Sequence, residues 1–178
     1  MQPCPLVFTP IYKPKVWGGR NLERLFGRSL PPGEKTGESW ECADLESGQS
    51  LGARGPAKGK SLRQLVEEWG PALLGRAALH DGRFPLLIKF LDAGEDLSVQ
   101  VHPDPESAQR WYGRPCEKHE AWYILDAAPG GVIYRGLSPG VTVEALAAAI
   151  ARRPEAIVQC LRKIPVRAGN SFYLPAGT

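Results

Sequence analysis

Two short segments in the middle of the chain alternate polar and apolar residues with a period of two, which is the period of a β-strand. Residues 97–102 place their polar side chains on one face: Ser98, Gln100 and His102. Residues 118–125 do the same with Lys118, Glu120 and Trp122. Such strands have one polar and one apolar face, so the pattern predicts a barrel whose polar interior can hold a metal ion while its other face packs on a core.

Composition favours strands joined by turns over a helical bundle, because 20 of the 178 residues are Gly and 17 are Pro. The formal net charge is only +3, and the Lys and Arg residues are scattered rather than clustered. This excludes the dense basic patch that is typical of nucleic-acid binding, and we expect no nucleic-acid partner.

The four cysteines, Cys4, Cys42, Cys116 and Cys160, contain no CxxC pair, which predicts reduced thiols in a cytoplasmic protein. The N-terminus lacks the basic head and long apolar stretch of a secretory signal. The most apolar window, residues 84–91, carries Lys89 and is too short to span a bilayer. The sequence therefore predicts a soluble protein with no membrane partner.

Local signals place the expected elements along the chain. Strands are predicted over residues 6–17, 38–43, 85–93 (buried), 97–102, 119–126, 132–137 and 171–174. Helices are predicted over residues 21–26 with Asn21 as cap, 61–69, 104–111, 142–151 and 154–161. We expect a mainly β fold, a small barrel or jelly roll, as one domain over residues 1–178 with helical insertions near 61–75 and 142–161.

Gln100, His102 and Glu120 form a candidate metal site. Gln100 and His102 share a face about 6.7 Å apart by strand rise, and Glu120 adds the negative charge that a divalent cation needs. Nitrogen and oxygen ligands suit Zn²⁺, with Fe²⁺ or Mn²⁺ as lesser possibilities. The alternative from spacing alone is that His102 is a hydrogen-bonded structural residue.

Three further side chains have both a structural and a functional interpretation. Lys118 is either a solvated amine or, beside Glu120, a cation that attracts an anionic ligand. Ser98 is either a core hydroxyl or a donor to a phosphate oxygen. Lys89 either extends to the surface or faces a polar interior. His80 and His119 are expected to be bystanders, because His119 falls on the face opposite Glu120.

These motifs together resemble the type I mannose-6-phosphate isomerases, zinc enzymes of the cupin superfamily, and in particular their shorter bacterial branch. The resemblance lies in five segments that follow one another along nearly the whole chain: residues 13–19, 37–41, 97–104, 118–125 and 172–178. The segments 97–104 and 118–125 are specific when they occur together.

The resemblance implies one zinc ion held by Gln100, His102 and Glu120 and completed by a second histidine. It implies interconversion of mannose 6-phosphate and fructose 6-phosphate by proton transfer between C1 and C2 through a cis-enediol. Ser98 and Lys118 match family positions associated with the substrate, with Lys118 as the candidate catalytic residue. Lys89 is a weaker candidate for the same pocket.

One departure concerns the fourth ligand, a histidine that follows the stretch like residues 172–178 in the family. The sequence stops at Thr178, and His80, His102 and His119 all lie upstream. The arginine and acid/base residues expected further on are also missing. We therefore expect the N-terminal part of a longer enzyme, in a form that binds zinc weakly and turns over little or nothing.

A non-catalytic cupin that binds a sugar phosphate or a metal is the alternative function. An Fe²⁺ cupin oxygenase is less favoured, because it would need two or three closely spaced histidines where this chain has Gln100.

Overall fold

The computed structural model describes residues 3–178, which form two compact units that meet in sequence at Leu97 and Ser98. In this part of the chain, strand residues outnumber α-helical residues, as the sequence predicts. Hydrogen bonds join the strands of the described residues into four small sheets, two in each unit. The expectation of one domain over residues 1–178 stays a prediction.

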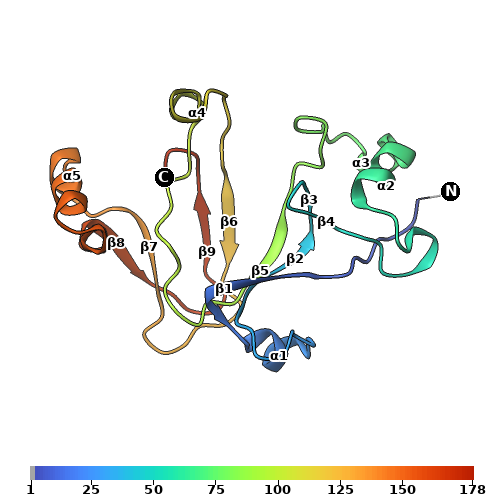
Figure 1. The fold of residues 1–178 in the computed structure, drawn as a ribbon, viewed down its shortest axis with the longest axis horizontal. Helices are drawn as coiled ribbons and strands as arrows, with labels where there is room; N and C mark the ends of the chain where they lie inside the picture. The colour runs from blue at the N-terminus through green and yellow to red at the C-terminus, as the bar shows by residue number, and fades with distance from the viewer. Residues whose placement is uncertain (1–2) are drawn as a thin grey trace. The chain divides into compact units, whose positions relative to one another are not determined.

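The main sheet of the first unit has the antiparallel order β1 (Ile11–Gly19), β2 (Thr36–Cys42), β5 (Ile88–Leu91) (Figure 1). Both β1 and β2 were expected from the sequence. Trp40 pairs with Ile11 on one side and with Lys89 on the other, so these three side chains share one face of the sheet.

The end of β1 is tied to the residues after β5 through Asp92. The Gly19 N–H donates to Asp92 O over 3.0 Å, and a Cβ on Gly19 would lie 2.5 Å from Asp92 Oδ1. Helix α1 (Asn21–Phe26) follows, but the prediction of Asn21 as its cap is wrong. The Asn21 amide instead donates to the buried Asp92 carboxylate, which also accepts the Leu22 N–H, because that carboxylate needs donors.

The remaining elements of the first unit are short. They are β3 (Asp44–Leu45), β4 (Gly48–Gln49), the 3₁₀ turn η1 (Gly55–Ala57), α2 (Leu62–Trp69) and α3 (Pro71–Leu74). The predicted helix after Ser61 is confirmed, and Ser61 and Gln64 form a capping box at its start. Its apolar stripe places Leu65 and Trp69 in a core cluster with Ala57.

The prediction of a buried strand over residues 85–93 is only partly right. The strand β5 is limited to Ile88–Leu91, and Ile88 is 53% exposed. Leu86 is exposed as well. A run of apolar residues therefore did not imply burial on both faces, because β5 is an edge strand of a three-stranded sheet.

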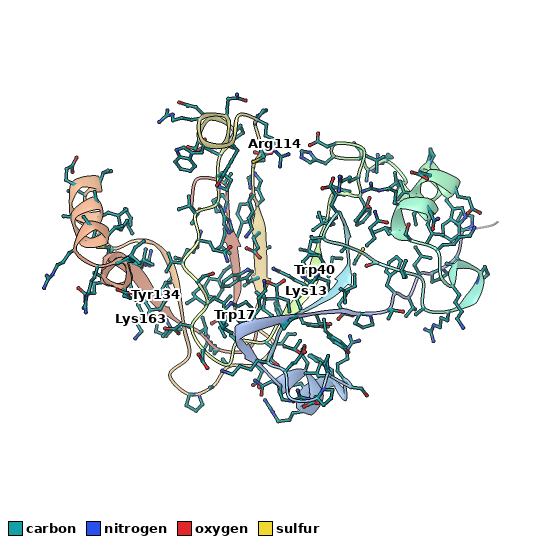
Figure 2. All side chains as sticks on the ribbon, in the orientation of Figure 1. Lys13, Trp17, Trp40, Arg114, Tyr134 and Lys163 are labelled. Carbon is teal, nitrogen blue, oxygen red and sulfur yellow. The ribbon has the colours of Figure 1, made fainter. Side chains whose placement is uncertain are left out.

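The second unit contains two antiparallel pairs of strands. One is β6 (Glu120–Tyr123) with β9 (Ser171–Leu174), which lie side by side in Figure 1, and the other is β7 (Val132–Leu137) with β8 (Leu161–Pro165). In the second pair Tyr134 lies opposite Lys163, and Figure 2 shows the two side chains together. Sequence patterns predicted β6, β7 and β9 but missed β8.

The two α-helices of this unit begin within one residue of the predicted positions. Asp104 caps α4 (Pro105–Tyr112), and Thr142 caps α5 (Val143–Arg152). The segment opened by Pro154 is a 3₁₀ helix, η2 (Pro154–Cys160), rather than the expected helix through residue 161. Leu161 instead begins β8, where its backbone takes part in the ladder.

The predicted strand over residues 97–102 is wrong, because these residues belong to no strand of the structure. Val99 and Val101, expected to pack on a core, are exposed, with Val101 at 64%. Only His102 has strand-like backbone bonds, to Gly177 and Thr178. Pro103 follows at once and has no N–H to extend a ladder.

Helices long and apolar enough to cross a bilayer are absent from residues 3–178.

Candidate functional site: a polar cluster at His102 and Glu120

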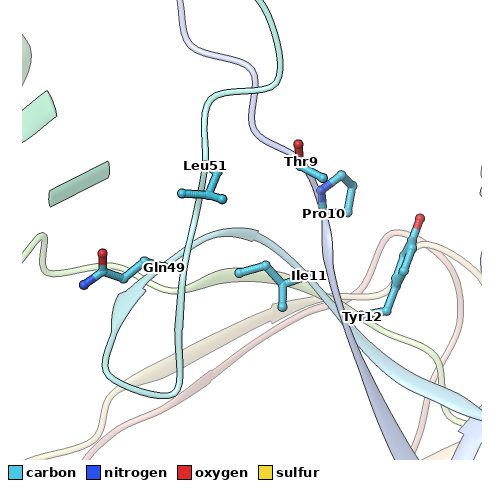
Figure 3. Close-up of a pocket in the computed structure, with 6 residues that line it drawn as sticks. All are labelled: Thr9, Pro10, Ile11, Tyr12, Gln49 and Leu51. Atoms are coloured by element: carbon cyan, nitrogen blue, oxygen red, sulfur yellow. The ribbon is translucent and has the colours of Figure 1, made fainter. Parts of the chain in front are cut away.

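Two pockets of the first unit are lined by none of the side chains that the sequence singles out. Figure 3 shows one of about 360 Å³, lined by Thr9, Pro10, Ile11, Tyr12, Gln49 and Leu51. This lining offers hydroxyl, phenol and amide groups but no charged side chain. Most of the side chains singled out by the sequence lie in the second unit instead.

The register of β6 and β9 brings His102 to Glu120. Glu120 opens β6 and lies opposite Leu174, the last residue of β9. The carbonyl oxygen of Leu174 faces the imidazole Nδ1 of His102 at 3.4 Å. Strand pairing therefore joins residues that are far apart in sequence at one end of the β6–β9 ladder.

Four of the predicted site residues form one connected cluster. His102 Nε2 lies 3.3 Å from Glu120 Oε2. Lys118 Nζ lies 3.2 Å from the same carboxylate oxygen and donates to Gln100 Oε1 over 3.3 Å. The side chains of His102 and Glu120 are only 6% and 17% exposed, so their charges and dipoles act in surroundings with little water.

Ser98 joins this cluster at its edge. The Gln100 amide donates to the Ser98 hydroxyl over 3.3 Å, and both residues are exposed. Gln100 therefore presents its carbonyl oxygen to Lys118 and its amide nitrogen to Ser98. The structure places Ser98, Gln100, His102, Lys118 and Glu120 in one continuous network, although residues 97–102 form no strand.

The donor set fits a zinc ion. A carbonyl oxygen can only accept, so a neutral His102 ring that donates to Leu174 carries its proton on Nδ1 and a lone pair on Nε2. That lone pair faces a carboxylate oxygen of Glu120, and two acceptors in this position are stabilised by a cation that both can bind. The oxygen Oε1 of Gln100, which is linked to Glu120 through Lys118 Nζ, would supply a third donor, of a type that zinc accepts less often.

Only two members of the cluster, His102 and Glu120, are of the residue types that most often bind metals. Among residues 3–178, no group of three or more His, Cys, Asp or Glu side chains is arranged to hold a metal ion. The amide of Gln100 is therefore essential to a three-residue site.

His119 lies away from this cluster, on the other face of β6, as the sequence predicts. Its Nδ1 is 2.6 Å from the Tyr173 hydroxyl, and the two rings stack at 5.9 Å. Its Nε2 lies 3.3 Å from Glu117 Oε2.

Lys89 belongs to the first unit, where it pairs with Glu38. Its Nζ lies 3.3 Å from Glu38 Oε1, and the Trp40 indole donates to Glu38 Oε2 over 2.6 Å. Lys13 stacks its ammonium over the Trp40 ring at 4.3 Å, and Figure 2 shows these two side chains together. Lys89 is thus a partly buried, paired cation on the sheet rather than a solvated amine.

The Glu38 carboxylate, which pairs with Lys89, is not among the site residues predicted from the sequence. Its burial acts to raise its pKa, but the Trp40 hydrogen bond and the charge of Lys89 outweigh burial, and the pKa is lowered overall. The available signal was the alternation of Glu38 and Trp40 two residues apart, which places both on one face of β2.

Because folding lowers the Glu38 pKa, the ionised carboxylate stabilises the fold above the unfolded-state carboxyl pKa of about 4.3. That stabilisation is lost as the pH falls through the lower pKa of the folded state. We expect Glu38→Gln to reduce the free energy of unfolding by about 1–2 kcal/mol at pH 7, because a charged hydrogen-bond partner is lost.

The difference in the free energy of unfolding between Glu38→Gln and wild type should shrink as the pH falls below about 4. Urea denaturation of both proteins at pH 7 and pH 3.5 measures it, and a difference that is constant with pH would contradict the role given to the charge. Glu46→Gln, at a highly exposed carboxylate paired with Arg83, is a suitable control.

Known proteins that are similar to this chain share one description. The profile of the family described as phosphomannose isomerase type I, catalytic domain, matches residues 6–128. Mannose-6-phosphate isomerase ManA of Bacillus subtilis is 40% identical over 174 residues, which are 98% of this chain and 53% of the relative. The mannose-6-phosphate isomerase of Streptococcus mutans is 40% identical over 164 residues, covering 92% of this chain and 49% of the relative.

Solved structures give the same result. The mannose 6-phosphate isomerase from Bacillus subtilis superimposes with a TM-score of 0.82 at 37% identity, covering 97% of this chain and 53% of that chain. A zinc-bound mannose 6-phosphate isomerase, 19% identical, matches in fold with a TM-score of 0.68 over 96% of this chain and 64% of that chain. The present chain spans about half the length of the curated relatives it matches.

The family match over residues 6–128, the identity of about 40% and the shared fold agree on one assignment. The chain belongs to the type I phosphomannose isomerase family.

Proposed function

We propose that this chain carries the zinc-binding part of an isomerase that interconverts mannose 6-phosphate and fructose 6-phosphate. The reaction moves a proton between C1 and C2 through a cis-enediol. The observation that carries the proposal is the convergence of Gln100, His102, Lys118 and Glu120 in a chain of this family.

In this proposal Gln100 Oε1, His102 Nε2 and Glu120 Oε2 hold the zinc ion. When bound, zinc polarises the sugar oxygens and stabilises negative charge that develops on them. The buried position of His102 and Glu120 keeps water from competing for the same donors.

Lys118 is the proposed catalytic residue. Its ammonium contacts both Gln100 and Glu120, so it can hold an anionic sugar oxygen next to the ligands by charge.

Ser98, at the exposed edge of the cluster, is a proposed donor to the sugar phosphate. Lys89 is proposed as a further substrate contact, with Glu38 as its paired carboxylate.

The proposal extends to the fold and the location of the protein. A cupin-type barrel is supported by the match to the Bacillus subtilis structure, and short antiparallel strand pairs are the elements from which such barrels are built. A cytoplasmic location is supported by four cysteines that are all free thiols.

The test is a coupled assay of mannose 6-phosphate conversion with the purified chain, before and after zinc removal by a chelator. In parallel, calorimetry measures binding of zinc and then of mannose 6-phosphate. We expect zinc to be needed for sugar-phosphate binding, and Lys118→Met to weaken sugar-phosphate binding while zinc affinity is kept. Zinc and sugar-phosphate binding without turnover would support a non-catalytic cupin, and no zinc binding would refute the proposal.

A further inference from the structure

The turn that follows β9, residues 175–178, bonds to the backbone of His102 on both sides of that residue. The His102 N–H donates to Thr178 O over 2.7 Å, and the Gly177 N–H donates to His102 O over 2.8 Å. Leu174, which precedes the turn, directs its carbonyl oxygen to the imidazole Nδ1 at 3.4 Å. One short segment therefore contacts the backbone and the ring of the same histidine.

We infer that this turn positions His102, holding its ring with the proton on Nδ1 and the lone pair of Nε2 directed at Glu120. The inference deepens the proposed function, since it assigns the residues that prepare one proposed zinc ligand. Leu174 and Gly177 are positioning residues, because they act on the site only through His102.

The hydrogen-bond partner of Nδ1 matters because an imidazole binds a metal only through the nitrogen that carries no proton. With the proton on Nδ1, the nitrogen that lies 3.3 Å from Glu120 Oε2 is the one that can bind. A ring with its proton on Nε2 would instead donate to Glu120 and present a lone pair to another acceptor, the Leu174 carbonyl. The Leu174 carbonyl and the Glu120 carboxylate therefore compete for the ring proton, and only donation to Leu174 leaves Nε2 able to bind a metal.

The shape of the turn depends on Gly177, whose φ of +85° is a conformation that residues with a Cβ rarely adopt. A Cβ at this position would meet only Asp104 Oδ2, at 3.9 Å, which is an ordinary contact. Gly177→Ala therefore disturbs the backbone angle without a steric clash. The peptide group that moves is the one whose N–H bonds to His102 O.

Gly169 is a matched control in the turn before β9. Its φ is +89°, and a Cβ there would have no atom within 4 Å, so Gly169→Ala imposes the same kind of backbone strain. Its N–H bonds to Ile124 O, at the far end of the β6–β9 ladder from His102. The two alanine variants separate the general cost of strain from an effect on His102.

The experiment compares wild type, Gly177→Ala and Gly169→Ala in two measurements. Long-range ¹H–¹⁵N NMR of the zinc-free chain, at a pH where imidazole is neutral, reports which ring nitrogen of His102 carries the proton. Competition with a chelator of known affinity then reports zinc binding. We expect similar falls in melting temperature for both variants, but a mixed tautomer and about 10–100-fold weaker zinc binding only for Gly177→Ala.

Gly177→Asn is a conservative rescue, because asparagine tolerates positive φ better than alanine and should restore part of the zinc affinity. If Gly177→Ala does not fold, Gly177→Asn still tests whether the turn affects the His102 tautomer and zinc binding. Equal tautomers and equal zinc affinities in Gly177→Ala and Gly169→Ala would overturn the inference, as would a wild-type His102 with its proton on Nε2. A tautomer change in a chain that binds no zinc would retain the positioning role and refute the proposed zinc site.

Discussion

Replacing Glu120 by glutamine is expected to reduce zinc affinity by more than about 100-fold, above the 10–100-fold range typical of outer partners of metal ligands. The substitution keeps the size of the side chain but removes the negative charge that faces His102 Nε2 and Lys118 Nζ. Without this charge, the remaining proposed donors are a neutral imidazole and a neutral amide, which compensate a divalent cation poorly.

The measurement is chelator competition with zinc, repeated with cobalt so that the absorption spectrum reports the ligand set. Glu117→Gln is the matched control, since Glu117 lies three residues earlier, is half exposed and contacts His119 instead of the cluster. An unchanged affinity in Glu120→Gln, or an equal loss in both variants, would show that Glu120 is not a ligand. Loss of zinc with an unchanged unfolding free energy would locate the effect at the site.

Replacing Leu65 by alanine is expected to give the largest loss of stability, about 2–5 kcal/mol. Leu65 is fully buried on α2 and packs with Ala57 and Trp69 in the core cluster of the first unit. Removing three carbon atoms there forfeits their transfer free energy and leaves a cavity, because neighbours held by a capped helix can collapse only in part.

Urea denaturation followed by tryptophan fluorescence measures this loss, and Trp69 in the same cluster provides a local signal. Leu86→Ala removes the same atoms from a side chain that is 57% exposed, and should cost less than about 0.5 kcal/mol. A cost below about 1 kcal/mol for Leu65→Ala would mean that the cluster around α2 does not behave as a packed core.

The sequence predicted those elements whose signals are local. The capping box of Ser61 with Gln64 and the caps at Asp104 and Thr142 each act within a few residues, and each of these helices begins within one residue of its predicted start. Strands β6 and β9 were also found, since alternation marked both segments.

Patterns that depend on distant partners gave wrong predictions. Alternation over residues 97–102 is that of a strand, yet no strand of the described chain pairs with it. The apolar run before Lys89 predicted burial, but the edge position of β5 leaves Ile88 exposed. Strand β8 has no local signal of its own and exists because β7 lies beside it.

The amino-acid sequence by itself determined the family motifs and the donor types of the candidate site: an amide, an imidazole, a carboxylate and an amine. Only the tertiary structure decided that these groups meet. Gln100 and His102 are neighbours in sequence, but Glu120 reaches His102 through the register of β6 with β9, and the ring contacts the Leu174 carbonyl, 72 residues away. A register and a backbone contact over that separation depend on how the chain folds back on itself, which no local pattern contains.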